Sequence, residues 1–260
     1  MQPTLKPRPN PIPAGTWLFN YVFRAPAFFL TTAFFGSLSL IASLWDKSGR
    51  QQHAIAQRWG RTITRISGSR VRVLNAQFLN GSVAVYCANH LSYMDTPVIF
   101  GALPFQFRIV ARHELFSLPF IGWHLTRSGQ VPVNISNPRA SVGSLSSAVR
   151  TLKSGLPLFI FPEGGRSDAG HPDEFLNGPA FMAVRAQVPL VPIALIGTWE
   201  LLPIHTSVFY PVPVTIAVGE PIDTIGYTMR DLDKLTARLR DEISRLYYQH
   251  SHLEPPVLST

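Results

Sequence analysis

Two side chains that can take part in proton transfer lie close together in Asn89-His90-Leu91-Ser92-Tyr93-Met94-Asp95. A neutral imidazole can take a proton from a hydroxyl, and a carboxylate on its second nitrogen fixes the tautomer and stabilises the imidazolium. His90 and Asp95 can meet only if the stretch folds back, which Pro97 favours because proline fits the first turn of a helix. A second interpretation stays open, in which Asp95 or Thr96 caps that helix and His90 only closes a loop.

A second polar group follows the apolar run 156–161, in Phe161-Pro162-Glu163-Gly164-Gly165-Arg166-Ser167. The two glycines let the backbone approach a ligand closely. The guanidinium of Arg166 can hold a phosphate through two parallel hydrogen bonds, and Glu163 could orient Arg166 or bind the acceptor molecule. An Arg–Glu pair that only locks a turn is the alternative, and this stretch alone does not decide between them.

Together the two stretches resemble the glycerolipid acyltransferase family, the bacterial lysophosphatidate acyltransferases and their relatives. The resemblance rests on Asn-His-x4-Asp followed some seventy residues later by Phe-Pro-Glu-Gly-Gly-Arg-Ser. Two further blocks agree with the family pattern, the stretch from Ala111 to Gly122 and Val191-Pro192-Ile193-Ala194. The similarity covers residues 70–220, with four blocks in the family's order.

The resemblance implies direct acyl transfer, with His90 as general base on the free hydroxyl of a lysolipid and Asp95 as its partner. The acyl donor would be the thioester of acyl-CoA or acyl-carrier protein, and no cofactor or metal is implied. The most fitting acceptor is 1-acyl-glycerol-3-phosphate, which gives phosphatidate in phospholipid biosynthesis. The residues expected to bind the substrate are Arg112, Arg139, Glu163, Gly164, Gly165 and Arg166.

Four positions depart from the family pattern, one of which is Arg112, a basic residue where lysine is typical. Ile135 stands where an arginine commonly contacts the acceptor phosphate, Gly165 replaces the expected threonine, and Asn177 stands where many members have lysine. Either Arg112 and Arg139 compensate, or the acceptor is another lysolipid, such as a lyso-amino-acid lipid. A membrane-bound thioester or ester hydrolase that uses the same His–Asp pair is a further hypothesis.

The order of apolar runs predicts an α/β domain with a mixed, mostly parallel sheet flanked by helices, behind an N-terminal apolar membrane-associating helical segment. Helices are expected over 138–153 and 178–187 and from Thr228 onward. Asn80-Gly81 between two apolar runs predicts an antiparallel hairpin. The expected strands are 71–76, 83–88, 107–111, 130–133, 156–161, 190–196 and 212–218.

The N-terminal region differs from the rest in charge and hydropathy. Residues 1–75 hold ten Lys and Arg against one acidic residue, whereas residues 76–260 hold thirteen against fourteen. Residues 25–45 carry no charge, and as a helix they would be about 31 Å long, the thickness of a bilayer core. This segment would span the membrane or enter one leaflet, with a buried core helix as a third possibility.

Basic residues beside an apolar segment indicate anionic lipid headgroups as partners, rather than nucleic acid, which would require a basic patch on the nearly neutral globular part. The slight excess of cations after the apolar segment favours the inner membrane, with the catalytic part on the cytoplasmic side. The expected organisation is a Pro-rich disordered tail (1–14), the membrane-associating segment (15–68), the α/β domain (69–250) and a C-terminal tail (251–260). The single cysteine, Cys87, is expected to be a small buried apolar side chain.

Overall fold

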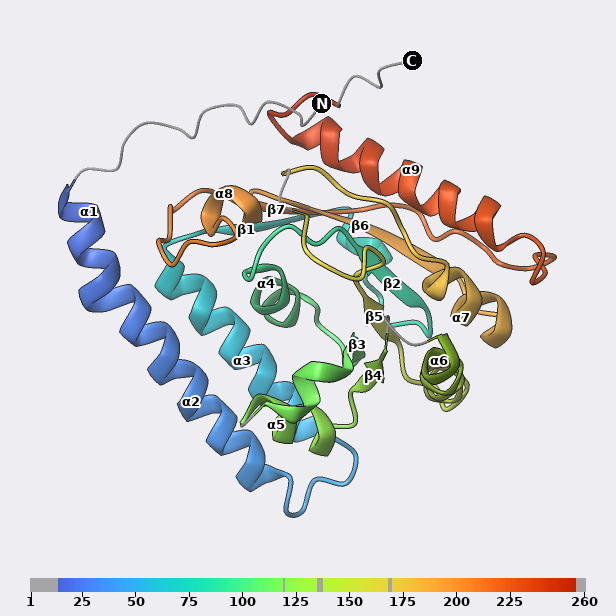
Figure 1. Ribbon diagram of the computed structural model, residues 1–260, viewed down its shortest axis with the longest axis horizontal. Helices are drawn as coiled ribbons and strands as arrows, with labels where there is room; N and C mark the ends of the chain where they lie inside the picture. Colours follow the sequence, from blue (N-terminus) through green and yellow to red (C-terminus); the bar gives the residue numbers. More distant parts are fainter. Residues whose placement is uncertain (1–13, 119, 135–137, 168–169, 256–260) are drawn as a thin grey trace.

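The computed structural model describes residues 14–118, 120–134, 138–167 and 170–255, with the backbone alone at 14–16 and 138–142. Seven described strands form one sheet in the order β1-β7-β6-β2-β5-β3-β4, with helices on both faces (Figure 1). β6 and β7 pair in antiparallel fashion, and every other neighbouring pair is parallel. The fold is therefore the predicted mixed, mostly parallel α/β architecture.

The strands are β1 (Val71–Leu74), β2 (Val85–Ala88), β3 (Arg108–Arg112), β4 (Val131–Val133), β5 (Leu158–Ile160), β6 (Leu190–Ile196) and β7 (Val214–Val218). The α-helices are α1 (Ala14–Phe19), α2 (Ala25–Ala42), α3 (Arg50–Ser67), α4 (Asp95–Ala102), α5 (Ile121–Arg127), α6 (Pro138–Lys153), α7 (Gly178–Ala186), α8 (Thr198–Leu201) and α9 (Leu232–His250). A π-helical turn, η1 (Asn20–Arg24), and two 3-10 helices, η2 (Ala76–Phe78) and η3 (His113–Ser117), complete the described elements.

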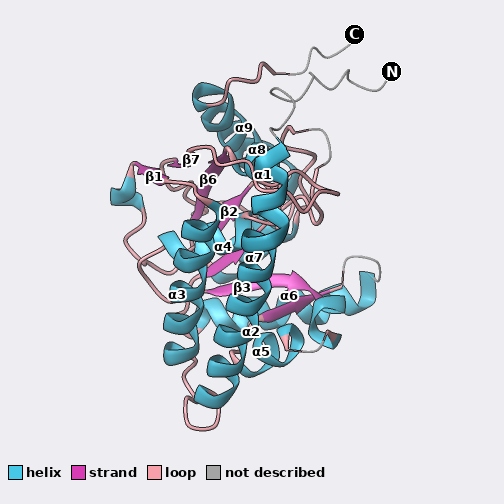
Figure 2. Ribbon diagram, turned by 90° about the vertical axis from the view of Figure 1, so that its left-hand side faces the viewer, coloured by secondary structure: helices cyan, strands magenta, loops and turns pink. Residues whose placement is uncertain are grey.

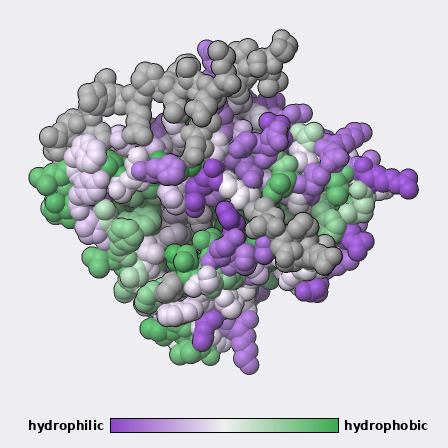
Figure 3. Space-filling view, viewed as in Figure 1, coloured by the Kyte–Doolittle hydropathy of each residue, from purple (hydrophilic) through white to green (hydrophobic). Residues whose placement is uncertain are grey.

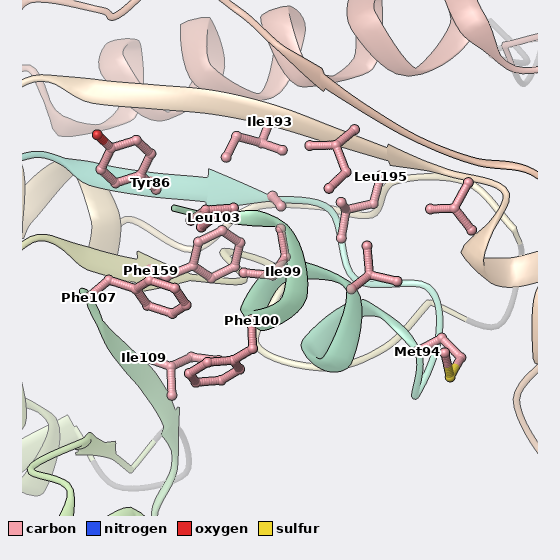
Figure 4. Close-up of a cluster of buried hydrophobic side chains, with 14 of the residues drawn as sticks. Tyr86, Met94, Ile99, Phe100, Leu103, Phe107, Ile109, Phe159, Ile193 and Leu195 are labelled. Carbon is pink, nitrogen blue, oxygen red and sulfur yellow. The ribbon is translucent and has the colours of Figure 1, made fainter. Parts of the chain in front are cut away.

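The two faces of the sheet bury separate cores, as expected for strands whose successive side chains point to opposite sides. In β2, Tyr86 and Ala88 face the core beneath α3 and α4, and Val85 and Cys87 face the core beneath α6, α7 and α9. Figure 4 shows part of the first core, where aromatic side chains fill the space between the sheet and α4. Cys87 is fully buried, as predicted, and burial raises the pKa of its thiol.

All seven predicted strands are present, but the predicted hairpin is wrong. β1 pairs with β7, whereas β2 lies between β5 and β6 in the middle of the sheet. Asn80 instead accepts a hydrogen bond from the Ser82 amide at 3.0 Å, so Asn80-Gly81 makes a local turn in the β1–β2 connection. β2 is buried at every residue, as is typical of a strand between two parallel neighbours with helices on both faces of the sheet.

The last predicted helix begins later than expected. α9 starts at Leu232, while the Asp231 carboxylate accepts hydrogen bonds from the backbone and hydroxyl of Thr228. These local bonds hold residues 228–231 in a turn ahead of the helix.

The N-terminal helical segment runs without interruption from α1 through η1 into α2 and then packs beside α3 and α5 (Figure 2). Among the described residues, one helix, Trp17–Ala42, is long and apolar enough to cross a membrane. Only 11% of its most apolar window is buried, so most of its side chains face outward. A buried core helix, the third possibility, does not fit this exposure.

α3 and α4 cross with their backbones in contact. A Cβ added at Gly60 would lie 2.3 Å from the carbonyl oxygen of Pro97 and 2.6 Å from the amide nitrogen of Gly101. Only glycine allows this approach. The crossing fixes α4, whose first residue is Asp95.

Candidate active site

The two polar stretches meet where neighbouring strands send their helices to opposite faces of the sheet. β2 leads into α4 on one face, and the adjacent β5 leads into α7 on the other. Such a switch point opens a crevice at the carboxyl ends of the strands, where α/β proteins commonly bind ligands. His90 follows β2, and Glu163 follows β5.

The His90–Asp95 stretch folds back as the predicted pair requires. The Nδ1 atom of His90 lies 2.8 Å from Oδ2 of Asp95, and the same oxygen accepts the backbone N–H groups of Leu91 and Ser92, both at 2.8 Å. Asp95 is fully buried, and three donors satisfy its charged oxygen, which lowers the cost of burying it. Because Nδ1 points at the carboxylate, Nε2 is the ring nitrogen left for a substrate.

The expectation that Asp95 or Thr96 caps the helix is wrong in detail. α4 begins at Asp95 itself, and Met94 occupies the capping position without a side-chain bond. Asp95 is instead used by the loop before the helix, because its carboxylate accepts bonds from residues 90–92.

Two further side chains attach the loop to the sheet. Asn89 donates to the carbonyl of Leu195 at 2.9 Å and accepts the Leu195 amide at 2.7 Å, which continues the β2–β6 pairing through a side chain. The hydroxyl of Ser92 donates to the carbonyl of Leu202 at 2.8 Å. Sequence reasoning assigned neither residue a role, although both lie inside the quoted motif.

The second loop, residues 161–167, forms hydrogen bonds with both the backbone N–H and the carbonyl of His90. The His90 amide donates to Oε1 of Glu163 at 2.9 Å, and the Ser167 amide donates to the His90 carbonyl at 3.0 Å. The imidazole also stacks on the ring of Phe161, with centroids 3.9 Å apart and planes 12° apart. Residues 161–167 therefore fix the position of His90, a contact that the sequence did not indicate.

Glu163 has an unusual environment for a carboxyl group. Burial raises its pKa to about 8, and the negative charges of Asp95 and Asp173 act in the same direction, against the bond from the His90 amide. The group is therefore mostly protonated at neutral pH, which is compatible with its use as an acceptor for a backbone N–H.

Replacing Glu163 with Gln should remove a pH dependence of stability. The folded pKa lies above the usual value of 4.5, so this group stabilises the fold fully below pH 4.5, and the stabilisation is lost as pH rises toward 8. We expect Glu163→Gln to be more stable than the parent at pH 8.5 by on the order of 3 kcal/mol, and equal to it near pH 4.5. Denaturant unfolding at both pH values measures this, and equal curves at pH 8.5 would contradict the raised pKa.

Two of the predicted binding residues with described side chains are arginines, Arg166 within this loop and Arg112 at the end of β3. The guanidinium carbon of Arg166 lies 4.0 Å from the centroid of the Tyr93 ring, a close cation–π contact within the Asn89–Asp95 stretch. Partial burial lowers the pKa of Arg166, against the smaller opposite effects of Tyr93 and Asp95. Arg112 is half exposed at the end of β3 and 3.4 Å from Glu114.

The other predicted residues add less. Gly164 has a φ of +71°, which favours glycine, and a Cβ at Gly165 would meet open space. Arg139 lies in the first turn of α6, but its side chain and Ile135 fall outside the described residues. Within the described part of the chain, no group of three or more His, Cys, Asp or Glu could hold a metal ion.

The sequence and the fold resemble those of known proteins. The family model described as Acyltransferase matches residues 70–196. A 1-acyl-sn-glycerol-3-phosphate acyltransferase of Cocos nucifera is 30% identical, over 88% of this chain and 75% of that protein. The chain belongs to the acyltransferase family.

Particular relatives share the same name. A bacterial 1-acyl-sn-glycerol-3-phosphate acyltransferase, from Pseudomonas aeruginosa, is 28% identical over 94% of this chain and 97% of its own length. A chloroplastic one from Arabidopsis thaliana is 33% identical over 62% of this chain, and the match spans 45% of that longer protein. The crystal structure of PlsC, the 1-acyl-sn-glycerophosphate acyltransferase of Thermotoga maritima, superposes with a TM-score of 0.74 at 25% identity, covering 88% of this chain and 95% of PlsC.

Proposed function

We propose that the protein transfers an acyl group from an acyl thioester to the free hydroxyl of 1-acyl-glycerol-3-phosphate, which yields phosphatidate. The observation that carries the proposal is the 2.8 Å contact between Nδ1 of His90 and the buried carboxylate of Asp95. The names of the relatives support the choice of acceptor.

In this mechanism His90 acts as the base. With its Nδ1–H donated to Asp95, the lone pair of Nε2 takes the proton of the lysolipid hydroxyl. The hydroxyl oxygen then attacks the thioester carbonyl carbon, and the tetrahedral intermediate collapses as the C–S bond breaks. The imidazolium returns its proton to the leaving thiolate, so the products are the new ester and a free thiol. Asp95 stabilises the imidazolium between these steps.

Arg166 and Arg112 are the proposed ligands of the acceptor phosphate. Guanidinium groups present parallel N–H donors that match phosphate oxygens. Gly164 and Gly165 leave the backbone beside Arg166 accessible, and Arg139 is kept as a further candidate. Glu163 was expected to bind the acceptor, but its bond to the His90 amide supports a positioning role instead.

The proposed donor is acyl-CoA or acyl-carrier protein, with no cofactor, and the proposed place is the inner membrane with the site on the cytoplasmic side. The long apolar helix at Trp17–Ala42, with most of its side chains facing outward, supports membrane attachment. The chain is proposed to act on membrane lipids and not on nucleic acid.

Thiol release from acyl-CoA, measured with and without lysolipids, tests the proposal. We expect release to depend on 1-acyl-glycerol-3-phosphate and to disappear in His90→Ala. Release that ignores every lysolipid would identify a hydrolase, and full activity of His90→Ala would exclude the mechanism. A panel of acceptors should include lyso-amino-acid lipids, because Ile135 replaces the arginine common in the family.

Tyr93 should matter for acceptor binding through its ring and not through its hydroxyl. The ring of Tyr93 holds the guanidinium of Arg166 in place, and losing this contact should weaken the free energy of acceptor binding by about 0.5–1 kcal/mol. This corresponds to about 2–5-fold in affinity. We expect Tyr93→Leu to raise the KM for the acceptor by this factor at unchanged kcat, and Tyr93→Phe to match the parent. Steady-state kinetics at saturating donor provides the measurement, and a loss shared by both variants would point to the hydroxyl instead.

A further inference from the structure

A group of exposed apolar side chains lies outside the N-terminal segment, on η3, on α5 and on the turn between them. Each is between 38% and 53% exposed. We call them the α5 apolar patch: Leu115, Leu118, Phe120, Ile121 and Trp123. Contiguous exposed side chains of this size mark contact with another molecule or with a membrane.

The backbone holds this patch outward under strain. Phe120 has φ +61° and ψ −56°, a conformation that a bulky residue adopts at a cost of about 1–3 kcal/mol. The neighbouring turn is tightly packed, because a Cβ at Gly122 would lie 2.1 Å from the carbonyl oxygen of Phe116. The rings of Phe120 and Trp123 contact each other at 5.2 Å between centroids. Because the turn is strained and closely packed, we infer that it holds the exposed rings of Phe120 and Trp123 in a fixed position on the surface.

The patch is continuous with the exposed face of the N-terminal helix. Ser39 of α2 lies 2.7 Å from Nδ1 of His124 in α5, and Arg127 of α5 donates to the hydroxyl of Ser43 at 3.2 Å. The apolar side chains at this end of α2, among them Leu38 and Ile41, are also exposed. In Figure 3 much of the hydrophobic surface lies on the side that carries α1 and α2 in Figure 1 and reaches the lower edge near α5.

The rim of the patch favours anionic headgroups. Arg112 and His113 precede it and Arg127 follows it, and all three side chains are exposed. The carboxylate of Glu114 is within 3.4 Å of both Arg112 and His113. The rim therefore carries a net positive charge beside an apolar surface, which matches the boundary between headgroups and acyl chains.

We propose that the α5 apolar patch inserts into the surface of an anionic bilayer as a second membrane contact beside α1 and α2, and that it places the acceptor site at the bilayer. The second part, that the patch places the acceptor site, rests on the proposed function. Arg112, a proposed headgroup ligand, directly precedes η3. A lysolipid could then move from the leaflet to Arg112 and Arg166 without crossing water.

Insertion is tested directly by fluorescence, independently of activity. An environment-sensitive fluorophore is attached to Ile121→Cys, or to Ile225→Cys as the matched control, which is 76% exposed in the β7–α9 connection. The native Cys87 is fully buried and leaves the label specific. In nanodiscs of phosphatidylcholine and phosphatidylglycerol (7:3) we expect a blue shift and iodide protection at position 121 and not at 225. Equal iodide quenching at both positions would overturn the proposal.

Activity supplies the second measurement. We expect Phe120→Ser/Trp123→Ser to lose about 10-fold or more in kcat/KM on long-chain lysophosphatidate in those nanodiscs, and to match the parent on a short-chain, water-soluble lysophosphatidate. Ile225→Ser/Met229→Ser, a change of two exposed apolar residues outside the patch, should match the parent in both assays. An unchanged rate on the nanodisc-bound acceptor, or an equal loss on the soluble acceptor, would contradict delivery from the bilayer. If the parent acylates neither acceptor, the proposed function fails, while the fluorescence still decides the insertion.

Discussion

Asp95→Asn should lower kcat by about 10⁴-fold and leave the KM of both substrates nearly unchanged. In Ser-His-Asp triads the same change of carboxylate to amide has an effect of this size. In the proposed mechanism the imidazolium of His90 forms only during proton transfer, so the charge of Asp95 would act on the transition state rather than on bound substrate. The change is small in volume, so it tests charge rather than shape.

The geometry of the loop makes this substitution informative. The amide oxygen can take the place of Oδ2 and still accept the backbone N–H groups of Leu91 and Ser92. The amide nitrogen would occupy the place of Oδ1, which is buried and has no hydrogen-bond partner among the described residues. The backbone bonds of the loop are kept while His90 loses its negative partner, and the unpaired buried amide N–H costs about 1–3 kcal/mol of stability.

Steady-state kinetics and thermal unfolding of the same preparations measure the effect. Asp241→Asn, an exposed change on α9, is the matched control and should keep full activity. A fall of kcat accompanied by an equal fall in stability would assign Asp95 a structural role only. A kcat within tenfold of the parent would show that His90 does not use a charged partner.

The sequence predicted the sheet well because its signals were local. Apolar runs bounded by polar turns identified every described strand, and α6 begins and ends at the predicted residues, Pro138 and Lys153. Pairing was less predictable, as the hairpin at Asn80-Gly81 shows. A turn signal describes four residues, whereas strand pairing depends on which long-range neighbours bury both faces of β2.

The candidate site also has features that local sequence predicts and features that depend on long-range contacts. The partnership of His90 and Asp95 was one of two open interpretations of the first stretch, and the family resemblance, which rests on both stretches, favoured it. The contacts of Glu163 with the His90 amide and of Tyr93 with Arg166 join segments about seventy residues apart. No spacing in the sequence indicates them, because they depend on β2 and β5 being neighbours.

The crossing of α3 and α4 is the other feature that only the structure reveals. It holds the first turn of α4, which carries Asp95, in position. Pro97, whose carbonyl contacts Gly60, lies two residues after Asp95 in the first turn of α4. A displacement of this turn would move the carboxylate away from His90. The close crossing thus connects α3 to the proposed catalytic pair.

Gly60→Ala should therefore destabilise the fold by about 3 kcal/mol and lower kcat as well. The added methyl group would meet backbone atoms of Pro97 and Gly101 that no rotamer change can move, so the two helices must separate. For a chain of this size the unfolding midpoint should fall by about 6–12 °C.

Gly143→Ala in α6, where an added Cβ meets nothing within 4 Å, is the matched control and should stabilise the fold by about 0.5–1 kcal/mol. Thermal unfolding of both variants in detergent, with kinetics at a temperature where Gly60→Ala stays folded, separates the two effects. A Gly60→Ala protein with the parent's midpoint and kcat would mean that α3 and α4 do not touch at this crossing.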